Sequence, residues 1–151
     1  MPPLDADAVI RLLDLAPLPE EGGMFRQVHA DAHSTAIYYL LAAPEFSGMH
    51  RLPGVEIFHH YAGAPVQMLL LHPDGRVEEP VLGDDLAAGQ RPLVVVPGGT
   101  WQGASTLGDW SLVGATMAPG YRDVDFELGT RAELTAGWPQ AAARIAELTR
   151  R

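Results

Sequence analysis

The segment that decides the fold occupies residues 50–63 and reads His50-Arg51-Leu52-Pro53-Gly54-Val55-Glu56-Ile57-Phe58-His59-His60-Tyr61-Ala62-Gly63. It combines three histidines and one glutamate with aromatic and β-branched residues that favour β-strands. Because successive side chains of a strand point to opposite faces, Glu56, Phe58 and His60 share one face of the predicted strand. The segment therefore predicts polar side chains on one face of an otherwise apolar β-structure.

Turn signals divide the rest of the chain into short strands. Strand-forming runs are expected at residues 24–29, 35–41, 66–71, 77–82, 93–96, 100–104 and 110–117. Turns rich in proline and glycine separate several of them, as at Pro73-Asp74-Gly75 and Pro97-Gly98-Gly99. About nine short strands with no helical pattern between them predict an all-β sandwich or barrel.

Helical patterns lie at the two ends of the chain. Asp5 is placed to cap a first helix, which Pro17 ends. Near the other end, Thr130 and Glu133 have the spacing of a capping box, and Pro139 suits the first turn of a last helix. We therefore expect short helices before and after the strands.

Length, composition and charge limit the class of protein. A chain of 151 residues without repeats or linkers fits one domain, residues 1–151, and 47% hydrophobic residues supply a core. The absence of cysteine excludes disulfides and thiolate chemistry. With no signal-peptide pattern and no apolar run near the ~20 residues that span a bilayer, we expect a soluble cytoplasmic protein without membrane contact. The net charge of −9 argues against binding nucleic acid.

The spacing of polar residues resembles the first motif of the cupins, which reads His-x-His, three or four residues, Glu, six residues, Gly. His50 takes the place of the first histidine, Glu56 that of the glutamate and Gly63 that of the glycine. Leu52 stands where the second histidine belongs. One metal ligand of the usual cupin set is therefore missing.

A second cupin motif, Pro-x-Gly followed two residues later by His, is matched from Pro97 onward, with Gln102 at the histidine position. More specifically, the chain resembles the small cupin group of uncharacterised function known as DUF985 or cupin-5. The resemblance rests on Leu18–Arg26, Ser34–Leu41, His50-Arg51, Tyr61–Gly63, Val96–Gln102, Ala118–Tyr121 and Phe126–Leu128. It implies an all-β jelly-roll cupin barrel that forms a homodimer.

The chain also departs from the pattern of that group after the first histidine. The group reads Asp-Glu-x-Trp-His-Phe, whereas here Val55 replaces the Asp, Phe58 the Trp and His60 the Phe. An acidic pocket residue is thus lost and a polar one gained.

The candidate site consists of four polar side chains that converge in the barrel. If His50 and Glu56 point inward, as the resemblance implies, strand alternation predicts that His60 does too, and Gln102 approaches from the strand of the second motif. A few polar groups in an apolar cavity are typical of a small-molecule site. We expect Phe58, Trp101 and Tyr39 to contact the ligand, with an interface role for Trp101 and core packing for Tyr39 as alternatives.

Two interpretations of this set differ in metal content. His50, Glu56 and His60 form a facial triad only if His60 reaches the position that Leu52 vacates, and the strand register argues against that. We therefore expect no metal and no other cofactor, and a direct pair between Glu56 and His50. Such a pair stabilises the imidazolium and favours an anionic or polyhydroxy ligand.

Other polar residues have structural interpretations. The role of His59 stays open between backbone bonding and a dimer seam. Glu20 and Glu21 lie either over the barrel mouth or in a solvated loop, and we expect the solvated loop.

The predicted function is binding of a small sugar- or hydroxyacid-like ligand. In the enzymatic version, an isomerase, epimerase or lyase, His50 and Glu56 are the catalytic residues: His50 exchanges protons, Glu56 orients it and Gln102 donates to the developing oxyanion. The alternatives are a non-catalytic sensor or storage module and, more distantly, a metal-dependent dioxygenase.

Overall fold

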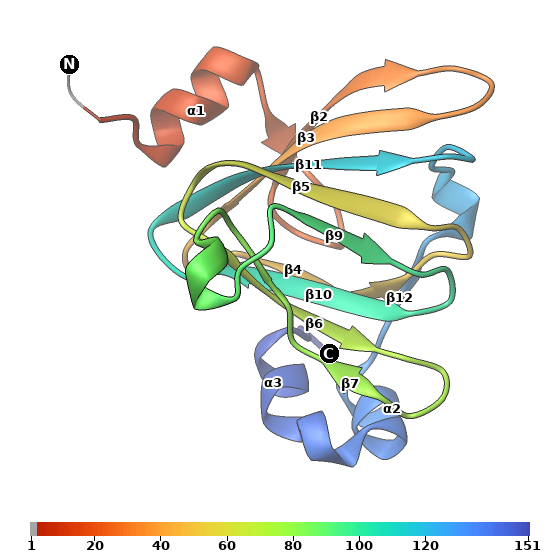
Figure 1. Cartoon of the computed structure of the whole chain (residues 1–151). Helices are drawn as coiled ribbons and strands as arrows, with labels where there is room; N and C mark the ends of the chain where they lie inside the picture. The colour runs from red at the N-terminus through yellow and green to blue at the C-terminus, as the bar shows by residue number, and fades with distance from the viewer. Residues whose placement is uncertain (1–2) are drawn as a thin grey trace.

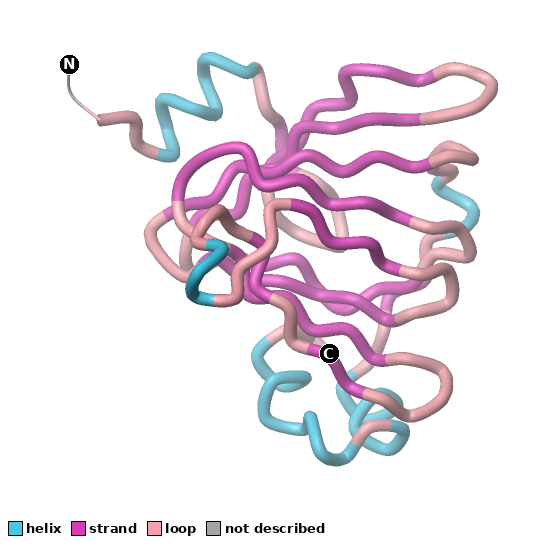
Figure 2. The backbone as a smooth tube through the Cα atoms, in the orientation of Figure 1, coloured by secondary structure: helices cyan, strands magenta, loops and turns pink. Residues whose placement is uncertain are grey.

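In the computed structural model, which describes residues 3–151, two antiparallel sheets of six strands face each other (Figures 1 and 2). The first sheet has the strand order β1 (Ala16–Pro17), β2 (Met24–Ala30), β3 (Thr35–Ala42), β11 (Trp110–Met117), β5 (Glu56–Gly63), β9 (Leu93–Val96). The second has the order β12 (Glu127–Leu128), β4 (Phe46–Arg51), β10 (Trp101–Thr106), β6 (Val66–Leu71), β7 (Val77–Glu78), with β8 (Val81–Leu82) also paired to β6. The predicted all-β jelly roll is confirmed, although hydrogen bonds do not close the two sheets into one continuous barrel.

The helices lie at the ends of the chain, as predicted. They are α1 (Ala6–Leu13), α2 (Arg131–Gly137) and α3 (Ala142–Glu147), with the 3₁₀ turn η3 (Pro139–Ala141) between the last two. Two further 3₁₀ turns, η1 (Leu86–Ala88) and η2 (Asp123–Asp125), lie between strands. The Asp5 carboxylate accepts from the Ala8 amide at 2.8 Å, and the Thr130 hydroxyl from the Glu133 amide at 3.4 Å. The cap at Asp5 therefore forms as predicted, and of the capping box at Thr130 the half made by the Thr130 hydroxyl forms. Among residues 3–151, no helix has the length and apolar character needed to span a membrane.

The run at residues 77–82, expected to be one strand, forms two strands of two residues. Pro80 lies between them and has no amide hydrogen to donate to a neighbouring strand. Its carbonyl still accepts from the Met68 amide at 3.0 Å, so the segment stays alongside β6.

The segment that decides the fold is divided between the two sheets. His50 is near the end of β4 in the second sheet, and Glu56 begins β5 in the first. Residues 52–55 form the turn that crosses from one sheet to the other. This crossing brings His50 and Glu56 into the space between the sheets from opposite sides.

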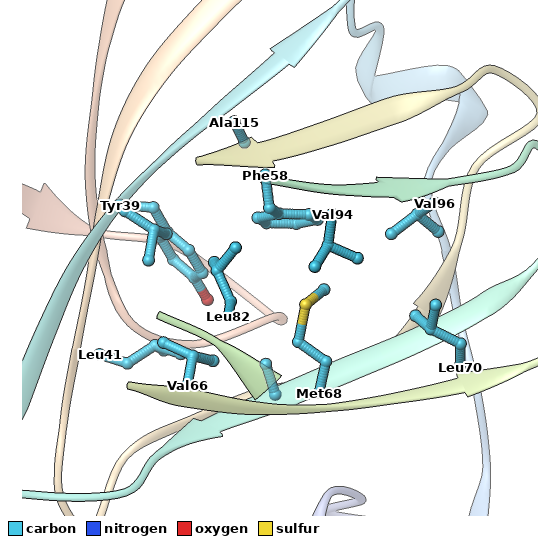
Figure 3. Close-up of a cluster of buried hydrophobic side chains, with 12 residues drawn as sticks. Tyr39, Leu41, Phe58, Val66, Met68, Leu70, Leu82, Val94, Val96 and Ala115 are labelled. Atoms are coloured by element: carbon cyan, nitrogen blue, oxygen red, sulfur yellow. The ribbon is translucent and has the colours of Figure 1, made fainter. Parts of the chain in front are cut away.

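Apolar side chains from both sheets fill part of that space (Figure 3). The cluster consists of Tyr39, Leu41, Phe58, Val66, Met68, Leu70, Leu82, Val94, Val96, Ala104, Val113 and Ala115. Leu18, Phe25 and Ile37 pack against its border and also line the adjoining cavity. The core thus forms the floor of the cavity.

Helices cover part of the outer faces of both sheets. Helices α2 and α3 pack below the second sheet in Figure 1, where Leu134, Ile145 and Leu148 contact Met49 and Trp101. Helix α1 packs on the first sheet through Val9 and neighbouring residues. The predicted ligand contact by Trp101 is therefore wrong, because its side chain lies under the C-terminal helices.

Candidate functional site

A cavity of about 990 Å³ lies between the sheets next to the core. Its wall is formed by Leu18, Pro19, Glu20, Glu21, Phe25, Gln27, Thr35, Ile37, His50, Leu52, Glu56, Ala115, Met117, Tyr121, Arg122, Asp123 and Phe126. About half of these residues are apolar, and the ionisable side chains come from three places: the loop before β2, the facing ends of β4 and β5, and the segment after β11. This size and this mixture are typical of a pocket for a small molecule.

Glu56 is the buried carboxyl group of this cavity, with only 8% of its surface exposed. Its Oε1 accepts a hydrogen bond from Gln102 Nε2 at 2.9 Å. Its Oε2 accepts no hydrogen bond from the residues that the structure describes. Burial raises the pKa of Glu56 to about 7; Glu21 adds to the rise, whereas His50 and Gln102 oppose it. Near neutral pH, Glu56 is therefore able both to give and to accept a proton.

His50 is held from two sides and is only 2% exposed. Its Nδ1 lies 2.7 Å from the Gly48 carbonyl, which accepts only, so Nδ1 carries the proton. Its Nε2 faces Glu21 Oε1 at 3.6 Å, and its ring stacks on Phe126 with centroids 5.3 Å apart. No hydrogen bond or ion pair among the described residues joins His50 to Glu56, so the expected direct pair is wrong. The partner of His50 is Glu21.

Glu21 was expected in a solvated loop, yet its side chain is 13% exposed and points into the cavity. Its Oε2 accepts from the Ser47 hydroxyl at 2.7 Å. The loop turns back because Glu20, Gly22 and Gly23 adopt positive φ angles of 66°, 97° and 82°. The pair of glycines after Glu21 was the sequence signal for this turn, but the contact with His50 depends on tertiary packing.

Gln102 supports Glu56 instead of lining the cavity. It pairs in register with His50 across β10 and β4, which places both side chains on the inner face of the second sheet. Its amide nitrogen is engaged by Glu56. The structure thus brings three of the four predicted polar residues together, with Gln102 behind Glu56.

His60 does not belong to this group. It lies four residues beyond Glu56 on β5, roughly 13 Å along the strand, and its Nε2 lies 3.1 Å from the Ala64 carbonyl. Alternation predicted its face correctly, but the length of the strand takes it to the other end of the sandwich. The neighbouring His59 faces outward and lies 3.0 Å from the Thr116 hydroxyl.

The aromatic residues predicted to contact the ligand have structural positions. Phe58 and Tyr39 belong to the core cluster (Figure 3). Burial raises the pKa of Tyr39 well above 10, so its hydroxyl keeps its proton and donates to the Gly22 carbonyl at 2.5 Å. Trp101 lies outside the cavity, with the Arg51 guanidinium 4.4 Å from its ring centroid. The ring that lines the cavity beside His50 is Phe126.

The segment after β11 contributes residues that the sequence did not indicate. Tyr121, Arg122 and Asp123 line the cavity, and the Tyr121 amide donates to the Thr35 hydroxyl at 2.9 Å. Partial burial, with Asp123 nearby, raises the pKa of Tyr121 to about 12. Its hydroxyl therefore keeps its proton at neutral pH.

The residues present do not fit the metal centre that the cupin fold implies. Leu52 occupies part of the wall, and both nitrogens of His50 face protein oxygens. Within residues 3–151, no three His, Asp or Glu side chains are grouped so as to hold a metal ion. Gln, as a neutral amide, is a weak ligand in place of the later histidine.

Comparisons with known proteins agree with this architecture. Residues 7–129 match the family model Cupin_5, described as cupin superfamily (DUF985). The chain is similar to protein SO0799 from Shewanella oneidensis, with 34% identity and a TM-score of 0.91 over 98% of this chain and 99% of that one. It is also similar to a hypothetical protein from Leishmania major, with 29% identity and a TM-score of 0.88 over 97% and 99% of the two chains.

A more distant likeness concerns the fold alone. A mutant of Bacillus subtilis oxalate decarboxylase is 12% identical, with a TM-score of 0.62 over 90% of this chain and 38% of that one. No curated protein sequence matches this chain.

Proposed function

This chain belongs to Cupin_5, the DUF985 group of the cupin superfamily, and we propose that its cavity binds a small sugar-like polyhydroxy compound on which Glu56 acts as an acid–base group. The observation that carries the proposal is the position of Glu56, which is buried, lines the cavity and is held by Gln102 through one carboxylate oxygen. A carboxyl group whose pKa lies near 7 is suited to proton transfer at neutral pH.

The charges of the cavity favour an uncharged ligand over an anion. Carboxyl groups of Glu20, Glu21, Glu56 and Asp123 line it, whereas Arg122 and His50 are the basic side chains of its wall. A hydroxyacid anion would meet like charges, but hydroxyl groups both donate to carboxylates and accept from the Tyr121 hydroxyl. A neutral sugar or polyol therefore fits better than an acid.

The reaction class that fits is proton transfer next to a carbonyl, as in isomerisation or epimerisation. The Glu56 carboxylate takes a proton from the carbon beside the carbonyl, the C–H electron pair forms a carbon–carbon double bond, and the carbonyl π pair moves onto oxygen. The resulting enolate oxygen accepts a hydrogen bond from the Tyr121 hydroxyl. The protonated Glu56 then returns its proton to carbon, which restores the carboxylate and completes the reaction. Glu21 lies 3.6 Å from His50 Nε2 and forms part of the same wall.

The test combines binding and exchange. Thermal shift is measured over neutral sugars, polyols, hydroxyacids and nucleotide sugars, and the best ligand is then incubated with the protein in D₂O and followed by NMR. We expect a neutral polyhydroxy ligand to gain deuterium at a carbon beside its carbonyl with the wild type, and Glu56→Gln, which keeps the shape and the Gln102 contact, to abolish the exchange. If no member of the panel binds, or if Glu56→Gln exchanges as fast as wild type, the proposal fails.

A non-catalytic sensor or storage module is the second candidate. The feature that favours it is His50, whose two ring nitrogens already face the Gly48 carbonyl and Glu21. In that case Glu56→Gln weakens binding, but the wild type gives no deuterium exchange.

A further inference from the structure

Arg150, next to the last residue of the chain, binds the loop that carries Glu21. Its Nη1 donates to the Glu21 carbonyl at 2.9 Å, and its Nη2 donates to the Phe46 carbonyl at 3.0 Å. The same Nη2 pairs with the Glu45 carboxylate, and the guanidinium lies over the Phe46 ring, 4.0 Å from its centroid. One side chain thus joins the loop to the start of β4.

Two glycines make room for this guanidinium. A Cβ atom on Gly48 would lie 2.8 Å from Arg150 Nη1, and a Cβ atom on Gly22 would collide with Nη2. Gly22 also has a φ angle of 97°, which side chains disfavour. The chain therefore has a socket for the Arg150 guanidinium on the outer side of the loop.

The main chain and the side chain of Glu21 make contacts on opposite sides of the loop. Its carbonyl faces the socket, where it accepts from Arg150 and, at 2.7 Å, from the Gly48 amide. Its carboxylate faces the cavity, where it meets the Ser47 hydroxyl and His50 Nε2. Because the backbone is held from outside, the side chain is directed inward.

We propose that Arg150 is a positioning residue, which holds the Glu21 carboxylate inside the cavity, facing His50 and within electrostatic reach of Glu56. An Arg suits this task because its planar fork binds two carbonyls and a carboxylate at once, whereas Lys carries a point charge on a flexible chain. The C-terminal end of the chain is in this way connected to the functional site.

The position of Glu21 has a measurable effect on Glu56. The ionisable groups that act on the Glu56 carboxyl are His50 on β4, which lowers its pKa, and Glu21, which raises it. Tyr121, Arg122 and Asp123 of the segment after β11, and Glu20 of the loop, line the same cavity. The chemical importance of this effect rests on the proposed function, but its measurement needs no ligand.

The test is an NMR titration of the Glu56 side-chain carboxyl carbon in wild type, Glu21→Gln, Arg150→Ala and Arg150→Lys. We expect the Glu56 midpoint to move down in Glu21→Gln, and down by a similar amount in both Arg150 variants, because Glu21 is then free to leave the cavity. If Arg150 acted on Glu56 only through its own positive charge, its loss would move the Glu56 midpoint up. The direction of the shift in Arg150→Ala therefore distinguishes a positioning role from a direct charge effect. In the double variant Glu21→Gln/Arg150→Ala, we expect no shift beyond that of Glu21→Gln.

Arg151→Ala is the matched control, because the side chain of Arg151 makes no hydrogen bond or ion pair within residues 3–151; it should leave the midpoint unchanged. Circular dichroism checks that the variants fold, as expected for a side chain that is 38% exposed. An unchanged or raised midpoint in Arg150→Ala overturns the role of Arg150, and an unchanged midpoint in Glu21→Gln overturns the position of Glu21. A ligand panel without any hit refutes the proposed function and leaves this titration untouched.

Discussion

Replacing Glu56 with Gln should change how the stability of the protein depends on pH. The pKa of Glu56 rises from its ordinary value of 4.5 to about 7 on folding, because burial disfavours the carboxylate. Between these two values the native state binds more protons than the unfolded state, so the contribution of Glu56 to stability is fully present below pH 4.5 and is lost as the pH rises through 7. At about 1.4 kcal/mol for each pH unit, the loss amounts to about 3 kcal/mol.

Glu56→Gln removes this ionisation and keeps an oxygen for the Gln102 amide. We therefore expect the free energy of unfolding of the variant, relative to wild type, to rise by about 3 kcal/mol between pH 4.5 and pH 8. Urea denaturation at a series of pH values measures it, with Glu79→Gln as the control, because Glu79 is exposed. A difference between wild type and Glu56→Gln that stays constant over this range would refute the burial of an ionisable carboxyl group.

Three further predictions concern the frame around the site. Tyr39→Phe removes the hydrogen bond to the Gly22 carbonyl and should lower the free energy of unfolding by about 1 kcal/mol; an unchanged urea midpoint would contradict the bond. Trp101→Ala should lower the free energy of unfolding by about 3–5 kcal/mol, since Trp101 packs under α2 and α3. The folded variant should keep the ligand-induced thermal shift of wild type; loss of that shift would show that Trp101 contributes to the binding site. We also expect a homodimer, because the edge strand β9 exposes Leu93 and Val95; sedimentation at micromolar concentration that shows only the 16.2 kDa monomer would contradict it.

The fold was predictable because turn residues and short β-forming runs alternate along the chain. The caps at Asp5 and Thr130 were predictable for the same reason, since each depends on residues three positions apart. His50 and Glu56 were found from motif spacing, which reflects a crossing between sheets of fixed length. Features of this kind depend on residues close together in the sequence, so tertiary packing does not alter them.

Alternation along strands explains both a correct and a wrong prediction at the site. Gln102 faces inward, so its neighbour Trp101 has to face outward, and the two were not compatible as ligand contacts. For His60, alternation gives the face but not the distance along the strand. Its shared face with Glu56 therefore did not place it in the cavity.

Glu21 was missed because its position depends on contacts between residues distant in the sequence. The loop is held by Arg150, 129 residues away, and its carboxylate meets Ser47, 26 residues away. Glycines after a pair of glutamates indicate a turn, but they do not indicate the direction of the carboxylate. His50 therefore pairs with Glu21, and not with Glu56 as the sequence had suggested, because of this packing between residues distant in the sequence.

One buried carboxyl group in the cavity, that of Glu56, should titrate near neutral pH. The most direct measurement is the NMR titration of the Glu56 carboxyl carbon in the wild-type protein, with Glu56→Gln to assign the signal. We predict a midpoint near 7, the value to which burial raises the pKa. A midpoint near 4.5, the ordinary value of a glutamate, would contradict the burial of Glu56 as an ionisable group.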